Sequence, residues 1–180
     1  MKSKMLYIIS RCGLFAAIIC VCAFINFPVG NVPVSMATLG IMLTGVVLSP
    51  VEAVFASFVY ILIGMIGVPV FSLGSAGLGT LFGATGGYIW SYPVLCLSVS
   101  LFSKIPIENK HIRFFVTFCG SMVGNAVCYF CGTIQYMAVC DASFISAVTV
   151  CVLPFVIIDA VKAFVASGMG LAIRQRIKNL

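Results

Sequence analysis

The chain has 180 residues, of which 62% are hydrophobic and 8% are charged. Soluble globular domains carry roughly 25% charged residues, so this composition excludes a soluble protein and indicates an integral membrane protein. A membrane-crossing helix needs about 20 apolar residues, so the chain has room for at most about seven crossings and for no separate soluble domain. We therefore expect one transmembrane domain over residues 1–180.

The formal net charge of +6 would suggest a nucleic-acid partner in a soluble protein. Here the positions of the basic residues are more informative, because all except Lys162 fall into three clusters. The positive-inside rule places such clusters on the cytoplasmic side of a membrane. We therefore expect a multi-pass cell-membrane protein with both termini in the cytoplasm and with no nucleic-acid partner. The clusters are Lys2, Lys4 and Arg11; Lys104, Lys110 and Arg113; and Arg174, Arg176 and Lys178.

The first half of the chain predicts three helices. The first covers about residues 6–27; its basic start resembles a signal peptide, but the apolar run continues, so we interpret it as a transmembrane helix. Two prolines in the polar segment 28–35 indicate an external turn. Shorter helices are expected over about residues 36–48 and 51–68, with Ser49-Pro50 between them.

The second half predicts three further helices. A glycine-rich connection up to about residue 81 leads into a helix over about 81–102, and a charged loop separates it from a helix over about 114–139. Pro154 divides the last apolar stretch into an external piece and a final helix over about 155–173. Six crossings bring the three basic clusters to one side. The predicted fold is an all-α integral membrane protein with six transmembrane helices in a compact bundle.

Two ionisable residues, Asp159 and Lys162, fall within the final helix. Each costs roughly 2.5–3.5 kcal/mol at the centre of a membrane helix, and the i, i+3 spacing puts both on one face. They form either a structural ion pair or the polar floor of a ligand cavity, and we favour the cavity because intramembrane charges are functional by default. Glu52, in contrast, stands at a helix start, where an acid complements the helix dipole, so we expect it to cap that helix.

The glycine-rich stretch PVFSLGSAGLGTLFGATGGYIW spans Pro69 to Trp90. Non-helical backbone at membrane depth persists only where it is buried in protein or lines a cavity, so this segment is a candidate for the mouth of a ligand site. The alternative is close packing of helices through small residues, which would account for Gly83 and Gly87. The glycines are Gly74, Gly77, Gly79, Gly83, Gly86 and Gly87.

The nine cysteines are scattered along apolar runs, where a thiol behaves as a small hydrophobe. Cys128 and Cys131 have redox spacing but lie in the middle of a predicted helix, so packing is favoured. A thiol-active membrane enzyme that uses these two cysteines is kept as an alternative. His111 has no acidic or cysteine neighbours at ligand spacing, and we expect neither a metal site nor a cofactor.

A second small-residue pattern lies in the first helix, where Ala16 and Cys20 are four residues apart. Small residues at this spacing permit close approach of another helix, either inside the bundle or from a partner in the membrane. The residues alone favour internal packing.

Four stretches also match one known family, in order and at natural spacing over about residues 14–166. They are GMIGVPVFSLGSAGLGTLFGATGGYIWSY (64–92), VLPFVIIDAVKA (152–163), LFAAIICVCAFINFPVGNVPVSMATL (14–39) and, more weakly, YFCGTI (129–134). Together they resemble the BioY biotin transporters, which are the substrate-binding S components of energy-coupling factor (ECF) transporters. Asp159 and Lys162 are in register with the charged residues of the second motif.

The resemblance implies a biotin site. In it, Asp159 accepts hydrogen bonds from the ureido ring, and Lys162 either neutralises Asp159 or contacts a polar end of the ligand. The aromatic residues Phe71, Tyr88 and Trp90 are expected to flank the bicyclic ring. Ser72, Gly74 and Thr85, with the adjacent Gly86, are expected to lie near the valerate carboxylate.

The resemblance also implies partners. An ECF transmembrane coupling subunit is expected to contact the face of Ala16 and Cys20, and separate ATPase subunits supply energy, because the chain has no phosphate-binding loop of its own. We therefore expect a transporter subunit rather than an enzyme. An S component for another vitamin, such as thiamine or riboflavin, is the nearest alternative.

The sequence departs from the family pattern at three single positions and in one three-residue segment. Ala84 stands where proline is usual, Gln135 where tryptophan is common, and Cys20 where alanine is usual. Val156, Ile157 and Ile158 lack the proline and glycine often found before the aspartate. None of these changes removes a charged group.

Overall fold

The computed structural model describes residues 2–27 and 33–178, most of which are helical. Ser72–Gly74 forms a short 3-10 turn, and β1 (Asn26–Phe27) and β2 (Val34–Ser35) form a two-stranded antiparallel pair. These observations confirm the predicted all-α class. The helices are α1 (Lys2–Phe24), α2 (Ala37–Val47), α3 (Pro50–Met65), α4 (Gly77–Leu81), α5 (Gly86–Ser103), α6 (Lys110–Cys140), α7 (Phe144–Cys151) and α8 (Leu153–Lys178).

The helices α1, α2, α3, α5, α6 and α8 correspond to the six helices predicted from the sequence, whereas α4 and α7 are additional short ones. Within residues 2–27 and 33–178, three stretches are long and apolar enough to cross a membrane: Met5–Phe24, Lys110–Cys140 and Phe144–Arg176. The helices α2 and α3 are apolar but shorter, as expected. The chain is therefore a helical membrane protein.

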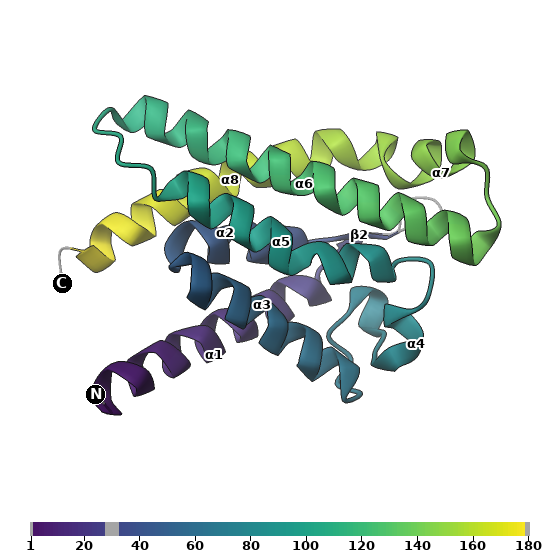
Figure 1. Cartoon of the computed structure of the whole chain (residues 1–180), viewed down its shortest axis with the longest axis horizontal. Coiled ribbons are helices and arrows are strands. Elements are labelled where there is room, and N and C mark those ends of the chain that lie inside the picture. Colours follow the sequence, from purple (N-terminus) through teal and green to yellow (C-terminus); the bar gives the residue numbers. More distant parts are fainter. Residues whose placement is uncertain (1, 28–32, 179–180) are drawn as a thin grey trace.

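The short helix α2 occupies the centre of the bundle. It packs against α1, α5 and α8, while α5 packs against α3 on one side and α6 on the other. Figure 1 shows α5 and α6 side by side, with α1 and α3 on the opposite side of the molecule from α6. The chain enters α1 and leaves α8 at the same end of the bundle (Figure 1).

Close contact between α5 and α6 depends on Gly87. A Cβ atom at this position would collide with the backbone carbonyl of Cys131, which cannot yield as a flexible side chain can. Close packing of helices, the alternative explanation for the glycine-rich stretch, therefore accounts for Gly87. Gly74 has another use: its φ of +70° lies in the left-handed region, which lets the chain turn before α4.

The start of α3 confirms the role predicted for Glu52. The Ser49 hydroxyl accepts a hydrogen bond of 3.4 Å from the Glu52 backbone N–H, and Glu52 Oε2 accepts one of 3.1 Å from the Ser49 N–H. This reciprocal pair is a capping box. Glu52 Oε1 also lies 3.4 Å from Arg11 Nη1, which joins α3 to α1.

Two of the predicted breaks between helices are the external turn over residues 28–35 and Pro154. Residues 28–32 of the predicted external turn lie outside the described residues, but on either side of them Asn26 pairs with Ser35 and brings β2 against the end of α1. Pro154 occupies the first turn of α8, where its missing N–H costs no helical hydrogen bond. Pro154 thus separates α7 from α8, as predicted.

The small residues of α1 lie on two different faces. Ala16 is 1% exposed, and Cys20 is half-buried against the central hydrophobic core, so this pair packs within the bundle. Gly13, Ala17 and Val21 lie on the exposed face of the same helix. Because residues four apart recur on one helical face, Gly13 and Ala17 form an outward small-residue pair. This face differs from that of Ala16 and Cys20, for which the residues alone favoured internal packing and the family resemblance implied a partner contact.

Candidate functional site

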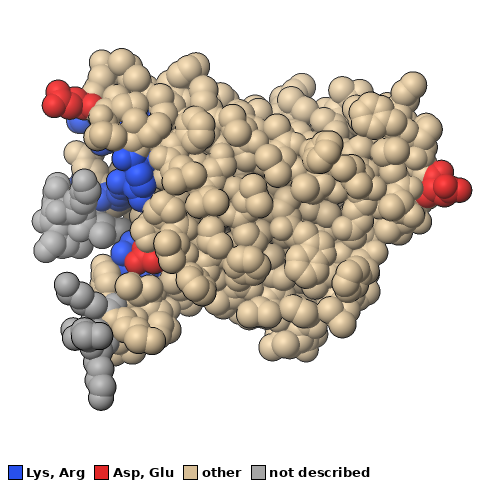
Figure 2. Space-filling view, viewed as in Figure 1, with Lys and Arg blue, Asp and Glu red and all other residues tan. Residues whose placement is uncertain are grey.

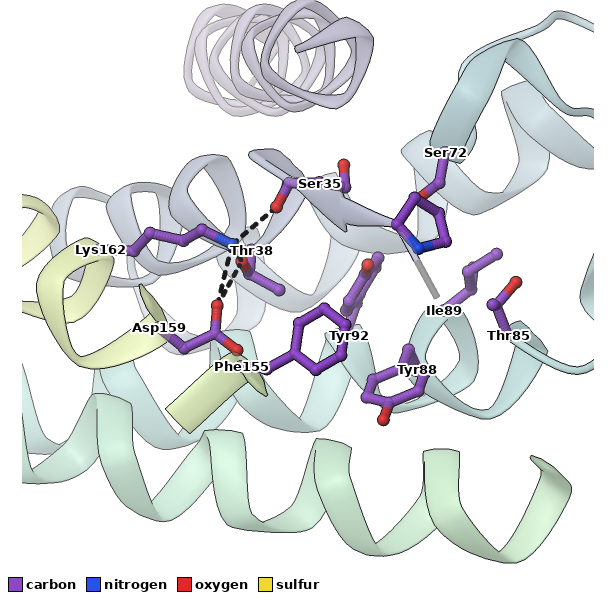
Figure 3. Close-up of a pocket in the computed structure, with 11 residues that line it drawn as sticks. Ser35, Thr38, Ser72, Thr85, Tyr88, Ile89, Tyr92, Phe155, Asp159 and Lys162 are labelled. Carbon is purple, nitrogen blue, oxygen red and sulfur yellow. Dashed lines mark hydrogen bonds and ion pairs between the residues drawn. The ribbon is translucent and has the colours of Figure 1, made fainter. Parts of the chain in front are cut away.

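A cavity lies where β2, the start of α2, the 3-10 turn, the start of α5 and the start of α8 meet (Figure 3). Its volume is about 50 Å³. Five of the nine predicted binding residues line it: Ser72, Thr85, Tyr88, Asp159 and Lys162. The others in its wall are Pro33, Ser35, Thr38, Ile89, Tyr92 and Phe155.

Asp159 and Lys162 form an ion pair in the wall of this cavity. Lys162 Nζ lies 2.9 Å from Asp159 Oδ1, and both residues are 4% exposed. The ammonium also donates to the Ser35 carbonyl at 2.8 Å and to the Thr38 hydroxyl at 3.0 Å. An ammonium has three N–H donors, so these three acceptors match its capacity.

The Asp159 carboxylate connects three helices. Its Oδ1 accepts from Lys162 and from the Thr38 hydroxyl, the latter at 3.3 Å, and its Oδ2 accepts from the Tyr129 hydroxyl at 2.8 Å. A carboxylate offers about four acceptor positions. Oδ2 therefore retains an acceptor position beside the one that Tyr129 uses.

Tyr129 is a functional candidate that sequence reasoning missed, although the YFCGTI motif begins with it. Thr38 and Ser35 were missed as well, because hydroxyl residues near the start of a short helix give no sequence signal for a contact more than 120 positions away. Only the packing of α2 against α8 brings them to the ion pair.

Aromatic side chains form the middle of the cavity. Figure 3 shows Phe155, Tyr92 and Tyr88 between Asp159 and Lys162 at one end and Ser72 and Thr85 at the other. The Tyr88 hydroxyl donates to the Cys151 carbonyl at 2.5 Å, which ties its ring to the junction of α7 and α8. The result is an apolar slot with a polar group at each end.

Helical phase explains which aromatic residues of α5 face the cavity. Thr85, Tyr88, Ile89 and Tyr92 follow one another at helical spacing, so one face of the helix carries all four. Trp90 is two residues after Tyr88, about 200° around a helix with 3.6 residues per turn. Its side chain is 42% exposed, and its Nε1 donates to the Leu81 carbonyl at 3.1 Å.

The three remaining predicted binding residues also lie outside the cavity wall. Phe71 is buried with its ring against Gly64 and edge-on to Tyr60 at a centroid distance of 5.7 Å. Gly74 is exposed in the turn before α4. Gly86 is buried against the Leu81 carbonyl and the Gln135 side chain.

Gln135 stabilises the glycine-rich segment. Its Nε2 donates to the carbonyl of Leu81 at 2.9 Å and to that of Gly83 at 2.7 Å. A tryptophan, common at this position in the family motif, has a single N–H and cannot make both bonds. Gln135 thus holds the glycine-rich segment to α6 through two backbone carbonyls.

Cys128 and Cys131 are free thiols on α6. Cys128 is 1% exposed, and the Cys131 backbone carbonyl packs against Gly87. Packing between α5 and α6 accounts for both cysteines. A thiol-active site at Cys128 and Cys131 is therefore not favoured.

Comparisons with known proteins agree on one family. The model described as "BioY family" matches residues 1–179. The biotin transporter BioY2 of Lactococcus lactis subsp. cremoris is 33% identical over 99% of this chain and 96% of its own length. The biotin transporter BioY of Thermotoga maritima is 28% identical over 92% of this chain and 94% of its own.

A solved structure shares the fold. The crystal structure of the S component for biotin from an ECF-type ABC transporter superposes with a TM-score of 0.85, covering 97% of this chain and 94% of the other. The sequences are 20% identical in this alignment, so the likeness concerns the arrangement of the helices.

Proposed function

Because the chain belongs to the BioY family, we propose that it serves biotin uptake as a membrane-embedded S component, which binds biotin from the outer side and delivers it inward with an ECF energising module. The relatives with the highest coverage are named biotin transporters, which also supports a transporter subunit rather than an enzyme. The observation that carries the proposal is the Asp159 carboxylate at one end of an aromatic slot.

The chemistry of biotin suits the order of groups along the slot. Its ureido ring has two N–H donors, its bicycle is apolar, and its valerate chain ends in a carboxylate. Asp159 Oδ2 would accept a ureido N–H, since a charged acceptor makes the stronger bond. Tyr88, Tyr92 and Phe155 would enclose the bicycle, and the hydroxyls of Ser72 and Thr85 would reach the carboxylate.

Lys162 has a supporting role on this proposal. Its three donors already match Asp159, Ser35 and Thr38. It therefore neutralises the carboxylate and holds it in place, while Asp159 contacts the ligand. The sequence left two roles open for Lys162, and the proposal assigns it the neutralisation of Asp159 rather than a ligand contact.

Ligand entry requires the cavity to widen. Pockets for drug-sized molecules occupy roughly 300–1,000 Å³, whereas this one measures about 50 Å³. Side chains around Ser72 and Thr85, which come from irregular backbone between α3 and α5, must move apart to admit biotin.

We propose six crossings with both termini in the cytoplasm. Apart from Lys162, the basic side chains that the structure describes gather at the end of the molecule where α1 begins and α8 ends, and Figure 2 shows this concentration of Lys and Arg. The positive-inside rule assigns that end to the cytoplasm. The glycine-rich segment then lies toward the outer face.

The energising partners are part of the proposal. An ECF coupling subunit would approach the exposed face of α1 at Gly13 and Ala17, where the absence of large side chains permits close helix contact. Ala16 and Cys20 would support that face from inside the bundle. ATPase subunits bound to the coupling subunit would supply the energy.

The experiment that tests the ligand is isothermal titration of the purified chain with biotin, thiamine and riboflavin in parallel. Saturable binding of biotin alone is the expected result. Binding of thiamine or riboflavin without biotin would show that the chain serves another vitamin.

A further inference from the structure

A second cavity lies at the basic end of the bundle, away from the candidate biotin site. It has a volume of about 340 Å³ and lies between the loop after α5, the first turns of α6 and the last turns of α8. Four basic side chains line it, Lys104, Lys110, Arg113 and Arg174, against one acidic side chain, Glu108. The positive-inside rule accounts for positive charge at this end, but not for its convergence on one cavity.

Two of the four basic residues have structural partners. Lys104 Nζ donates to the carbonyls of Val46 and Val47, at 3.3 and 3.4 Å, where α2 ends. Arg174 Nη1 donates to the Ser103 carbonyl at 2.5 Å. Cations commonly stabilise helix C-termini in this way, so these two residues also hold the cavity walls together.

Arg113 is different. Its Nε is buried and has no hydrogen-bond partner among the residues that the structure describes. Buried donors are normally paired, and a buried guanidinium N–H without an acceptor among these residues is open to an acceptor from outside the chain. Arg113 also lines the cavity, so its guanidinium is positioned to meet an anion bound there.

The position of Lys110 and Arg113 at the start of α6 strengthens the argument. The N-terminus of a helix carries partial positive charge, and the first turn of α6 contains no acid. Basic residues here oppose the dipole and each other. An anion between them would offset both repulsions, and Arg binds phosphate in a planar, bidentate manner.

The apolar part of the wall identifies the source of the anion. Ile105, Pro106, Ile107 and Leu171 line the same cavity as the basic residues. A free inorganic anion gains nothing from such side chains, whereas a phospholipid places a phosphate next to glycerol and acyl groups. Basic pockets between membrane helices are a known type of anionic headgroup site.

We propose that this cavity binds the phosphate of an anionic phospholipid, with Arg113 and Lys110 as its main contacts. The lipid bridges α6 and α8 at the membrane face. This cavity shares no lining residue with the candidate biotin site, so either proposal can fail without affecting the other.

The test uses the full chain purified in detergent and measures retained lipid by native mass spectrometry. Phosphatidylglycerol and phosphatidylcholine with identical acyl chains are compared, with inorganic phosphate added as a competitor. Phosphatidylglycerol should bind at least about tenfold more tightly than phosphatidylcholine, because charge-assisted bonds to the phosphate are no longer opposed by a choline cation.

The Arg113→Gln substitution should weaken phosphatidylglycerol binding about tenfold, whereas Arg176→Gln, on the exposed part of α8 outside the cavity, should leave it unchanged. Lys110→Gln should weaken phosphatidylglycerol binding about fivefold. Because Lys110 is exposed, this variant provides the test if Arg113→Gln does not fold.

Equal affinity for the two lipids, or an equal loss with Arg176→Gln, would overturn the proposal. Full displacement of the lipid by millimolar phosphate would overturn its assignment to a lipid. Biotin titration of each variant checks the fold independently.

Discussion

Tyr129 on α6 and Asp159 on α8 are joined by a hydrogen bond of 2.8 Å from the tyrosine hydroxyl to Oδ2 of the carboxylate. Together with Thr38 on α2, this bond fixes the orientation of Asp159, which lines the cavity. The position of the proposed ligand acceptor therefore depends on a residue 30 positions away in the chain.

The first prediction concerns this bond. Tyr129→Phe removes one hydroxyl and keeps the ring, so Asp159 loses a charge-assisted bond and its fixed orientation. Such bonds contribute about 1.5–3 kcal/mol, and biotin affinity should fall about tenfold in a titration. Tyr7→Phe, at an exposed tyrosine on α1, is the matched control and should bind as the unmodified chain does. Equal affinities for both variants would show that Tyr129 does not position the site.

The second prediction separates a ligand contact from a structural ion pair. Asp159→Asn should weaken biotin binding at least about tenfold, because the charged acceptor of the ureido N–H is lost. Asp159→Asn and Lys162→Met each leave one buried charge uncompensated, which should lower the thermal midpoint of unfolding. The double variant should recover the midpoint but not the affinity. A folded double variant with normal biotin affinity would mean that the pair is structural only.

The third prediction concerns the two faces of α5. Trp90→Phe should change the biotin dissociation constant less than about twofold, because Trp90 lies outside the cavity wall. Tyr88→Phe removes the bond to the Cys151 carbonyl and loosens the aromatic wall, so it should weaken binding about fivefold. The reverse order of effects would mean that the open form of the site recruits Trp90.

The fourth prediction concerns topology. A membrane-impermeant maleimide applied to intact cells should label the exposed native Cys140. This residue is the last of α6, and that end of α6 lies opposite the end where α1 begins and α8 ends (Figure 1). The maleimide should not label a thiol introduced by Asn109→Cys in a Cys140→Ser background. Labelling of that position without breaking the cells would contradict the proposed orientation.

The fifth prediction concerns the coupling subunit. Ala17→Trp, on the exposed face of α1, should abolish biotin uptake in cells that contain the whole transporter and leave biotin binding by the purified chain intact. Ala16→Trp forces a large ring into a position that is 1% exposed, so the yield of folded protein should fall instead. Normal uptake with Ala17→Trp would place the contact elsewhere.

The sequence by itself determined the features that depend on local order and on the bilayer. Apolar runs between proline, glycine and charged breakers located the six main helices, because a chain in lipid must satisfy its backbone groups within each helix. The i, i+3 spacing of Asp159 and Lys162 put them on one helical face. The position of Glu52 at a predicted helix start indicated a capping role, and the capping box is present.

Tertiary structure decided which faces meet, because that depends on the rotation of each helix relative to its neighbours. It placed Ala16 inside and Ala17 outside, and it placed Tyr92 rather than Trp90 in the cavity wall. The two members of each pair have equally apolar neighbours in the sequence, so hydropathy cannot predict which one faces inward. Ser35, Thr38 and Tyr129 reach the ion pair only because α2, α6 and α8 pack together, and a buried charge stays in the membrane where such partners converge on it.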